Sequence, residues 1–174
     1  MKKVTKILAI IFGVIAADQL SKGYLIYLLT GRVPGMVDAW DLVSVPYLIR
    51  QVNAFLNIVF TWNPGASFSL LRGVGEYAPW AIALITAAIV GFILHYLFRR
   101  SCDPEQVPLA LIAGGAIGNL IDRVRFGAVV DFIDAHVGGW HWPAFNVADT
   151  CIVLGVALFI LKWYIERRKC TRAM

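Results

Sequence analysis

Hydrophobic residues dominate four stretches of this chain, and polar residues gather in the segments between them. Each stretch is long enough to cross a hydrocarbon core about 30 Å thick, which takes about 20 helical residues. The pattern therefore predicts four membrane-spanning helices, over 4–29, 79–98, 107–124 and 146–165. We expect a membrane all-α fold in which a four-helix bundle forms a single integral membrane domain over 1–174.

The segment 30–78, between the first two predicted spans, has a different pattern. Its stretch "FLNIVFTW" is rich in residues that favour β-strands, and "NPG" directly after it is a turn signal. We interpret this segment as a small periplasmic β-sheet or hairpin that rests on the membrane surface.

The composition agrees with a membrane protein. Of the 174 residues 59% are hydrophobic and the mean hydropathy is +0.71, whereas about half of the residues in a soluble domain are apolar. The formal charge of +5 comes from basic clusters that flank the apolar runs. These clusters anchor spans and do not form the continuous basic stripe that nucleic acid requires. The three cysteines show neither a disulfide framework nor metal-ligand spacing.

The basic clusters also predict the orientation of the chain. They lie near both termini and between the second and third spans, so we expect these three regions to be cytoplasmic. A cleaved signal peptide is the alternative interpretation of the N-terminus. The apolar stretch resumes after Asp18 and Lys22, however, and this favours an uncleaved span.

Several polar residues lie inside the predicted spans. Asp18 and Lys22 are spaced i, i+4 on one helix face, where a structural ion pair is the simplest interpretation. Gly114 and Gly118 form a small-xxx-small pattern that allows close helix packing. Polar side chains occupy the next turn of the third span: Asn119, Asp122 and Arg123.

The fourth predicted span begins with a capping pattern. Asn146 is a candidate N-cap, and Asp149 then falls at the third helical position, where a carboxylate accepts backbone N–H bonds. Taken alone, Asp149 is therefore interpreted as a capping residue. Taken together, the polar groups of three spans reach the same depth near the outer surface, and ionisable residues inside membranes mark functional sites.

The residue types restrict the chemistry of such a site. The chain has no Walker or H-E-x-x-H motif and no serine or cysteine in the setting of a nucleophile. Asp131, Asp134, His136 and His141 have spacings that match no metal-site pattern. Paired carboxylates remain: two that lie close together share one proton and can activate a water to cleave a peptide bond, with no metal or cofactor.

Four motifs together resemble the lipoprotein signal peptidases, also called signal peptidase II. They occur in the family's order and cover most of the chain: "DQLSK", "WNPGASFSLL", "GGAIGNLIDRVRFGAVVDFID" and "PAFNVADTCIVLG". The resemblance implies an intramembrane aspartyl endopeptidase of the bacterial cytoplasmic (inner) membrane. It would remove the signal peptide of a prolipoprotein by cutting before a diacylglyceryl-modified cysteine.

The resemblance also implies roles for individual residues. The catalytic aspartates map onto Asp131 and Asp149. Other retained positions are expected to line the substrate pocket: Asn63, Gly65, Asn119, Arg123 and Asn146. Three more are expected to support them: Asp18, Lys22 and Asp122. The implied partners are prolipoproteins, membrane lipids and inhibitors of the globomycin type, and we expect a monomer with its active site near the periplasmic surface.

Two regions depart from the pattern or lack a role in it. The stretch 30–52 matches no family motif and lengthens the outer loop. Asp134 follows Asp131 too closely to face the same way, and we interpret it as a surface or supporting carboxylate. With His136 and His141 it is expected to belong to a wet link between the third and fourth spans.

Three other functions are compatible with parts of the pattern. A transporter or channel could use the carboxylates as a proton relay, but relays run through the membrane and these groups stop at one depth. A metal-dependent hydrolase would use His136 and His141. A membrane scaffold would need the polar cluster only for packing.

Overall fold

The computed structural model describes residues 2–31, 48–65, 78–99 and 103–172. Within them lie four helices that are long and apolar enough to cross a membrane, which confirms the predicted spans. Their bounds are α1 Lys2–Thr30, α2 Ala78–Arg99, α3 Asp103–Phe126 and α4 Val147–Arg172. The parts 32–47 and 66–77 of the outer segment lie outside the described residues.

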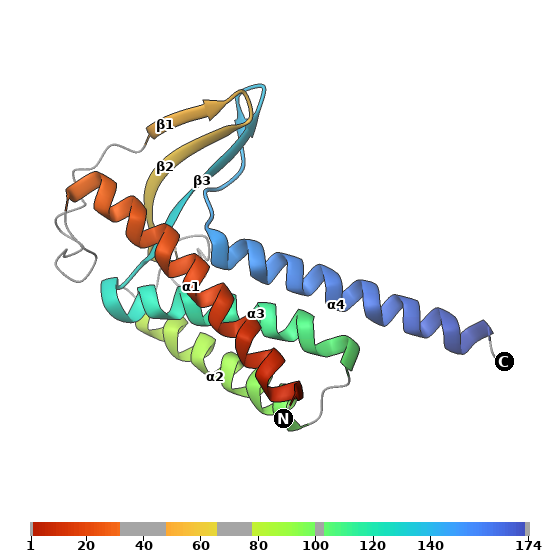
Figure 1. Ribbon diagram of the computed structural model, residues 1–174. Helices are drawn as coiled ribbons and strands as arrows, with labels where there is room; N and C mark the ends of the chain where they lie inside the picture. Colours follow the sequence, from red (N-terminus) through yellow and green to blue (C-terminus); the bar gives the residue numbers. More distant parts are fainter. Residues whose placement is uncertain (1, 32–47, 66–77, 100–102, 173–174) are drawn as a thin grey trace.

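The helices surround α3, which contacts α1, α2 and α4. α1 and α3 run toward the sheet, whereas α2 and α4 run away from it (Figure 1). Glycines allow α3 to approach α1 closely, as predicted. A Cβ at Gly114 would lie 2.9 Å from Cβ of Val14, and one at Gly118 would lie 2.7 Å from Oδ2 of Asp18. The third span is therefore the helix on which the site is assembled.

An antiparallel sheet of four strands projects from one side of the bundle (Figure 1). Its order is β1 Leu48–Asn53, β2 Leu56–Asn63, β3 Val129–Val137 and β4 Trp140–His141. The first two strands confirm the predicted β-rich segment, and β2 ends at the expected turn.

The connection between α3 and α4, interpreted as a wet link, forms β3 and β4. His141 in it is half exposed, as that interpretation requires, but Asp134 is buried and contradicts it. The stretch "VVDFIDAHV" of this connection has a β-favouring composition, and β2 would otherwise expose an unpaired edge. Pairing of β2 with β3 removes that edge and places Thr61 opposite Asp131. The sheet therefore carries one of the two predicted catalytic residues.

Two apolar clusters lie on either side of a polar layer. The cluster next to the sheet contains Leu25, Ile26, Phe60 and Val130. The cluster deeper in the bundle contains Ile7, Ile11, Leu97, Ala110 and Ala113. Asp18 and Lys22 lie between the two clusters along α1 and are buried. The two apolar clusters thus enclose Asp18 and Lys22, and charged groups that are shut off from water in this way need partners within the protein.

Candidate active site

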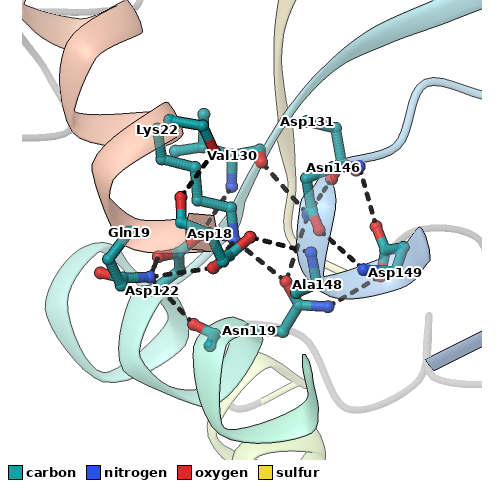
Figure 2. A network of polar contacts seen from close by, with 12 residues as sticks. Asp18, Gln19, Lys22, Asn119, Asp122, Val130, Asp131, Asn146, Ala148 and Asp149 are labelled. Carbon is teal, nitrogen blue, oxygen red and sulfur yellow. Dashed lines mark hydrogen bonds and ion pairs between the residues drawn. The ribbon is translucent and has the colours of Figure 1, made fainter. Parts of the chain in front are cut away.

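Lys22 is the centre of the polar layer and is 2% exposed. Its Nζ lies 2.8 Å from Oδ2 of Asp18 and 2.8 Å from Oδ2 of Asp122. It also donates a hydrogen bond of 3.1 Å to Oδ1 of Asn119 (Figure 2). The ammonium therefore has an acceptor for each of its three hydrogens, which a buried lysine requires. The predicted i, i+4 ion pair is present and forms part of a larger network.

Asp18 connects α1 to the beginning of α4. Its Oδ1 accepts a 3.0 Å hydrogen bond from the backbone N–H of Ala148, in the first turn of α4. That turn carries unpaired N–H groups and the positive end of the helix dipole, so a carboxylate is favourable there. Asp18 thereby holds the start of α4 against α1.

Gln19 has a part in the network that the sequence analysis did not assign. Its Nε2 lies 3.1 Å from Oδ2 of Asp18 and 2.9 Å from Oδ1 of Asp122, and 3.2 Å from the carbonyl oxygen of Gly118. It thus places an amide donor between two carboxylates that would repel each other. The only signal for it was its position inside the motif "DQLSK".

Asp122 connects α3 to β3. Its Oδ2 accepts a 3.2 Å hydrogen bond from the backbone N–H of Val130. Since Asp131 is the next residue of the strand, this bond fixes the backbone from which Asp131 projects. This geometry agrees with the expectation that Asp122 supports the catalytic residues, because the bond holds the strand next to Asp131.

Asp131 is buried, with 1% exposed, and two asparagine amides bind its carboxyl group. Asn63 Nδ2 donates to Oδ2 at 3.0 Å, and Asn146 Nδ2 donates to Oδ1 at 2.7 Å. Burial and the nearby charge of Asp149 together raise the pKa of Asp131 to about 6, against the opposing effect of the two asparagines and Lys22. The group is therefore able to hold a proton near neutral pH.

Asp149 has the predicted capping role and a further contact. Its backbone N–H donates to Oδ1 of Asn146 at 2.9 Å, while its Oδ2 accepts from the backbone N–H of Asn146 at 3.3 Å. This reciprocal pair is a capping box. Its Oδ1 also accepts a 2.7 Å hydrogen bond from Nδ2 of Asn119. The cap thus orients the carboxylate toward the polar layer.

Asn146 joins the two aspartates and is fully buried. The same side chain donates to Asp131 and accepts from the backbone of Asp149. Its Nδ2 also lies 3.1 Å from Oδ1 of Asn119 (Figure 2). A short chain of amides therefore links Lys22 to both carboxylates.

Gly65 acts on this arrangement through Asn63. Its backbone N–H donates to Oδ1 of Asn63 at 2.9 Å, which leaves the amide nitrogen of Asn63 to bind Asp131. Gly65 has φ +92°, and an added Cβ would collide with the side chain of Ile82. The positive φ is thus what favours glycine at this turn, since the terminal methyl of Ile82 could move aside.

Arg123 lies near both aspartates, and its charge interacts with those of Asp149 and Asp131. Its Nε is buried and has no hydrogen-bond partner among the described residues. The structure thus brings the predicted site residues together in one layer, and Nε of Arg123 is a donor in it that bonds to none of the described residues.

Asp134 does not belong to this layer. It is 1% exposed, so of its two interpretations the surface carboxylate was wrong and the supporting carboxylate stays a prediction. It accepts a 2.9 Å hydrogen bond from Nδ2 of Asn57, and both carboxyl oxygens lie 2.9 Å from Nδ1 of His141. Burial acts to raise its pKa, but the contacts with Asn57 and His141 outweigh it and hold the pKa below its usual range. Asp134 and Asp131 point to different partners, as predicted for their spacing.

The histidines give no support to a metal site. His136 stacks on His141 with ring centroids 4.9 Å apart. Within the described part of the chain, no three His, Cys, Asp or Glu side chains are grouped so that they could hold one metal ion.

A groove of about 370 Å³ opens beside Asp149. Its lining is mostly apolar and comes from the segment before α4 and from the first turns of α4: Trp142, Phe145, Asp149, Thr150, Val153 and Leu154. The polar layer therefore adjoins a surface that an apolar chain can occupy.

The fold and this layer define a multi-pass membrane protein with one buried polar site where the bundle meets the sheet. Residues 10–165 match the model of the family described as signal peptidase (SPase) II, and the chain belongs to this family. The chain is accordingly a peptidase that removes signal peptides from prolipoproteins. This confirms the predicted family and favours a peptidase over the transporter and scaffold alternatives.

Individual relatives agree with this assignment. The chain is 37% identical to the lipoprotein signal peptidase of Syntrophus aciditrophicus (strain SB), over 86% of this chain and 98% of that one. It is 50% identical to that of Paraburkholderia phymatum, over 64% and 68% of the two chains. A solved structure described as a bacterial membrane enzyme is similar with a TM-score of 0.69 and 28% identity, over 94% and 90% of the chains.

Proposed function

We propose that the protein is an intramembrane aspartyl endopeptidase that uses Asp131 and Asp149 as a catalytic pair. It cuts a prolipoprotein on the N-terminal side of its diacylglyceryl-modified cysteine. The pair shares one proton and activates one water, and it requires neither a metal nor a cofactor. The observation that carries this proposal is that one buried amide, Asn146, binds both aspartates.

The surroundings of the two aspartates support different roles for them, one as the proton donor and the other as the base. Two carboxyl groups held near each other in a buried site cannot both ionise easily, so the first proton is retained. The raised pKa of Asp131, about 6, favours this residue as the one that holds it. Asp149 is then the base that receives a proton from the attacking water.

The reaction follows from these protonation states. Asp149 takes a proton from water as the oxygen bonds to the scissile carbonyl carbon, while Asp131 donates its proton to the carbonyl oxygen. Collapse of the tetrahedral intermediate returns that hydroxyl proton to Asp131, and Asp149 transfers its proton to the leaving nitrogen. The products are the carboxylic acid of the signal peptide, which then loses its proton to the solution, and the amine of the modified cysteine, and the pair regains its starting state.

The predicted binding residues divide into two groups by their contacts. Asn63, Asn119 and Asn146 bind the aspartates directly and thus orient them. Arg123 has its buried Nε available among the described residues, so we assign it to a carbonyl oxygen of the substrate. Asp18, Lys22 and Asp122 hold α1, α3, α4 and β3 together around the pair.

The proposed location follows from the orientation of the spans. Basic residues gather at the ends of the helices away from the sheet, so we place both termini in the cytoplasm of a bacterium and the sheet in the periplasm. The catalytic pair then lies near the periplasmic surface of the inner membrane. We expect a monomer, and a cyclic peptide of the globomycin type would compete with substrate at this site.

Cleavage of a lipid-modified prolipoprotein by the purified protein in detergent tests the proposal. We expect cleavage that persists in EDTA and is lost in both Asp131→Asn and Asp149→Asn. Asp134→Asn, assayed at saturating substrate where only kcat is measured, is the matched control, because it makes the same change on the same strand outside the pair. Full turnover in either variant of the pair would contradict the mechanism, and loss in EDTA that added metal restores would contradict its independence from metal.

A further inference from the structure

Asp134 is a buried charged group that the proposed mechanism does not use. Its carboxylate is 1% exposed and faces the imidazole of His141. A buried carboxylate needs partners to offset the loss of water, and Asn57 and His141 provide them. His136, stacked on the ring of His141, covers one face of the pair. The arrangement therefore ties β4 to the buried side of β3.

The strand that Asp134 holds is short. β4 consists of Trp140 and His141 alone, and its ladder pairs His136 with His141 and Val137 with Trp140. A strand of two residues has little stability of its own. Further backbone bonds join the segment after β4 to β3: the N–H of Trp142 donates to the carbonyl oxygen of Ala135 at 2.8 Å, and Phe145 exchanges bonds of 3.0 and 2.8 Å with Ile133. The contact of His141 with Asp134 adds a side-chain link to these backbone bonds at the end of β4 nearest Trp142.

The residue that follows β4 is part of the groove beside Asp149. Trp142 and Phe145 contribute from the segment before α4, and Val153 and Leu154 contribute from α4 itself. Both α4 residues are exposed on the bundle surface, at 66% and 52%. In a membrane this surface faces lipid, so the groove leads from the catalytic pair toward the hydrocarbon phase.

We propose that the contact between the carboxyl group of Asp134 and Nδ1 of His141 fixes β4 and thereby holds Trp142 as a wall of the substrate groove. The occupant of the groove is the apolar part of the prolipoprotein next to the bond that is cut. This inference rests on the proposed function, because Asp149 identifies the groove as part of the active site. Asp134 is then a positioning residue that acts through Trp142.

Two features of the structure support this assignment. The groove is continuous with the catalytic carboxylate and with the lipid-facing side of α4, so its natural occupant is attached to the scissile bond and apolar. The lowered pKa of Asp134 means that its ionised form, which pairs with His141, is favoured in the fold. Since His141 has 48% of its side chain exposed, the ion pair makes a modest contribution.

Steady-state cleavage of a lipid-modified prolipoprotein by Asp134→Asn, Trp142→Ala and the double variant tests the inference. We expect KM to rise roughly tenfold in Trp142→Ala, since Trp142 is 56% exposed in the free protein and its truncation removes a large aromatic contact surface from the groove wall. We expect a rise of up to about fivefold in Asp134→Asn, in keeping with a partly exposed ion pair. If Asp134 acts through Trp142, the double variant has the KM of Trp142→Ala alone. The value of kcat stays within about twofold in all three.

The controls separate a positioning role from a general loss of structure. His141→Gln, which removes the other half of the pair at a half-exposed position, should reproduce the KM of Asp134→Asn. Phe55→Ala removes an aromatic side chain that is 63% exposed on the same sheet but does not line the groove, and its KM should stay at the wild-type value. Additive effects in the double variant, or an unchanged KM in Trp142→Ala, would overturn the inference. Failure of the proposed function would instead appear as full turnover in Asp131→Asn.

Discussion

Asp131 and Asp134 occur on the same strand, three positions apart, and each is 1% exposed. Their pKa values nevertheless move in opposite directions. Asp131 lies deep between the strand, α3 and α4, and a second carboxylate is near it. Asp134 is covered by a half-exposed imidazole that can carry a positive charge. The comparison teaches that the partners of a buried carboxyl group and its depth, rather than its exposed area, decide which protonation state the fold favours.

The largest expected difference between the two regions is in catalysis. Asp131→Asn should lower kcat on the order of a thousandfold, because it removes a group that transfers protons in the transition state. Asp134→Asn should leave kcat within about twofold, because no step of the reaction passes through it. Single-turnover cleavage at saturating substrate measures both. Equal losses in the two variants would mean that the strand as a whole, and not the pair, controls activity.

A second difference concerns the support on which each region depends. Lys22→Met would leave Asp18 and Asp122 as buried carboxylates without their cation, at a cost of about 3–5 kcal/mol in the free energy of unfolding. Denaturant unfolding in detergent measures this loss. Lys6→Met, at an exposed position of the same helix, is the control and should change the free energy by about 0.5 kcal/mol or less. Similar losses in both variants would contradict a central role for Lys22.

The third difference is the sign of the pH dependence of stability. The folded-state pKa of Asp131, about 6, lies above its ordinary value of 3.8, so its favourable contribution is complete below pH 3.8 and is lost as the pH rises through about 6. Relative to wild type, Asp131→Asn should therefore gain roughly 3 kcal/mol in the free energy of unfolding between pH 4 and pH 8.

Asp134 should behave in the opposite way. Its pKa is held below the usual range, so its contribution is present above the unfolded-state pKa of 3.8 and is lost as the pH falls. Asp134→Asn should be destabilised by about 1 kcal/mol or less at neutral pH, and this difference should shrink on acidification. Unfolding curves of both variants between pH 3.5 and 8 test the pair of predictions. If the free energy of unfolding of both variants, relative to wild type, changed with pH in the same direction, the contrast between Asp131 and Asp134 would be contradicted.

Much of the fold follows from the sequence because the bilayer limits the choices. A span needs a long apolar run, and α1, α2, α3 and α4 all coincide with such runs. The β-character of β2 is also evident locally. The role of the connection after α3 is not, since "VVDFIDAHV" becomes a strand only because β2 offers it an edge. Long-range pairing of this kind leaves no signal in a single segment.

In the candidate site, too, some features are evident from the local sequence and others depend on contacts between distant segments. The depth of the polar residues in three spans predicts one shared layer, and the motifs select Asp131 and Asp149 from it. The contacts of Gln19 and the bond from Ala148 to Asp18 depend on how α1, α3 and α4 meet, so the sequence does not reveal them. Asp134 was misinterpreted for a related reason: its cover comes from His141 across a turn and from Asn57 on another strand.

Infrared spectroscopy of aspartate-labelled protein tests most directly whether Asp131 and Asp149 share one proton. We predict a protonated carboxyl band at pH 5 that is absent in Asp131→Asn and disappears in wild type with a midpoint near pH 6. In Asp149→Asn the midpoint should move to lower pH, because the neighbouring negative charge is gone. An Asp131 that is already ionised at pH 5, or a midpoint that Asp149→Asn leaves unchanged, would contradict the shared proton.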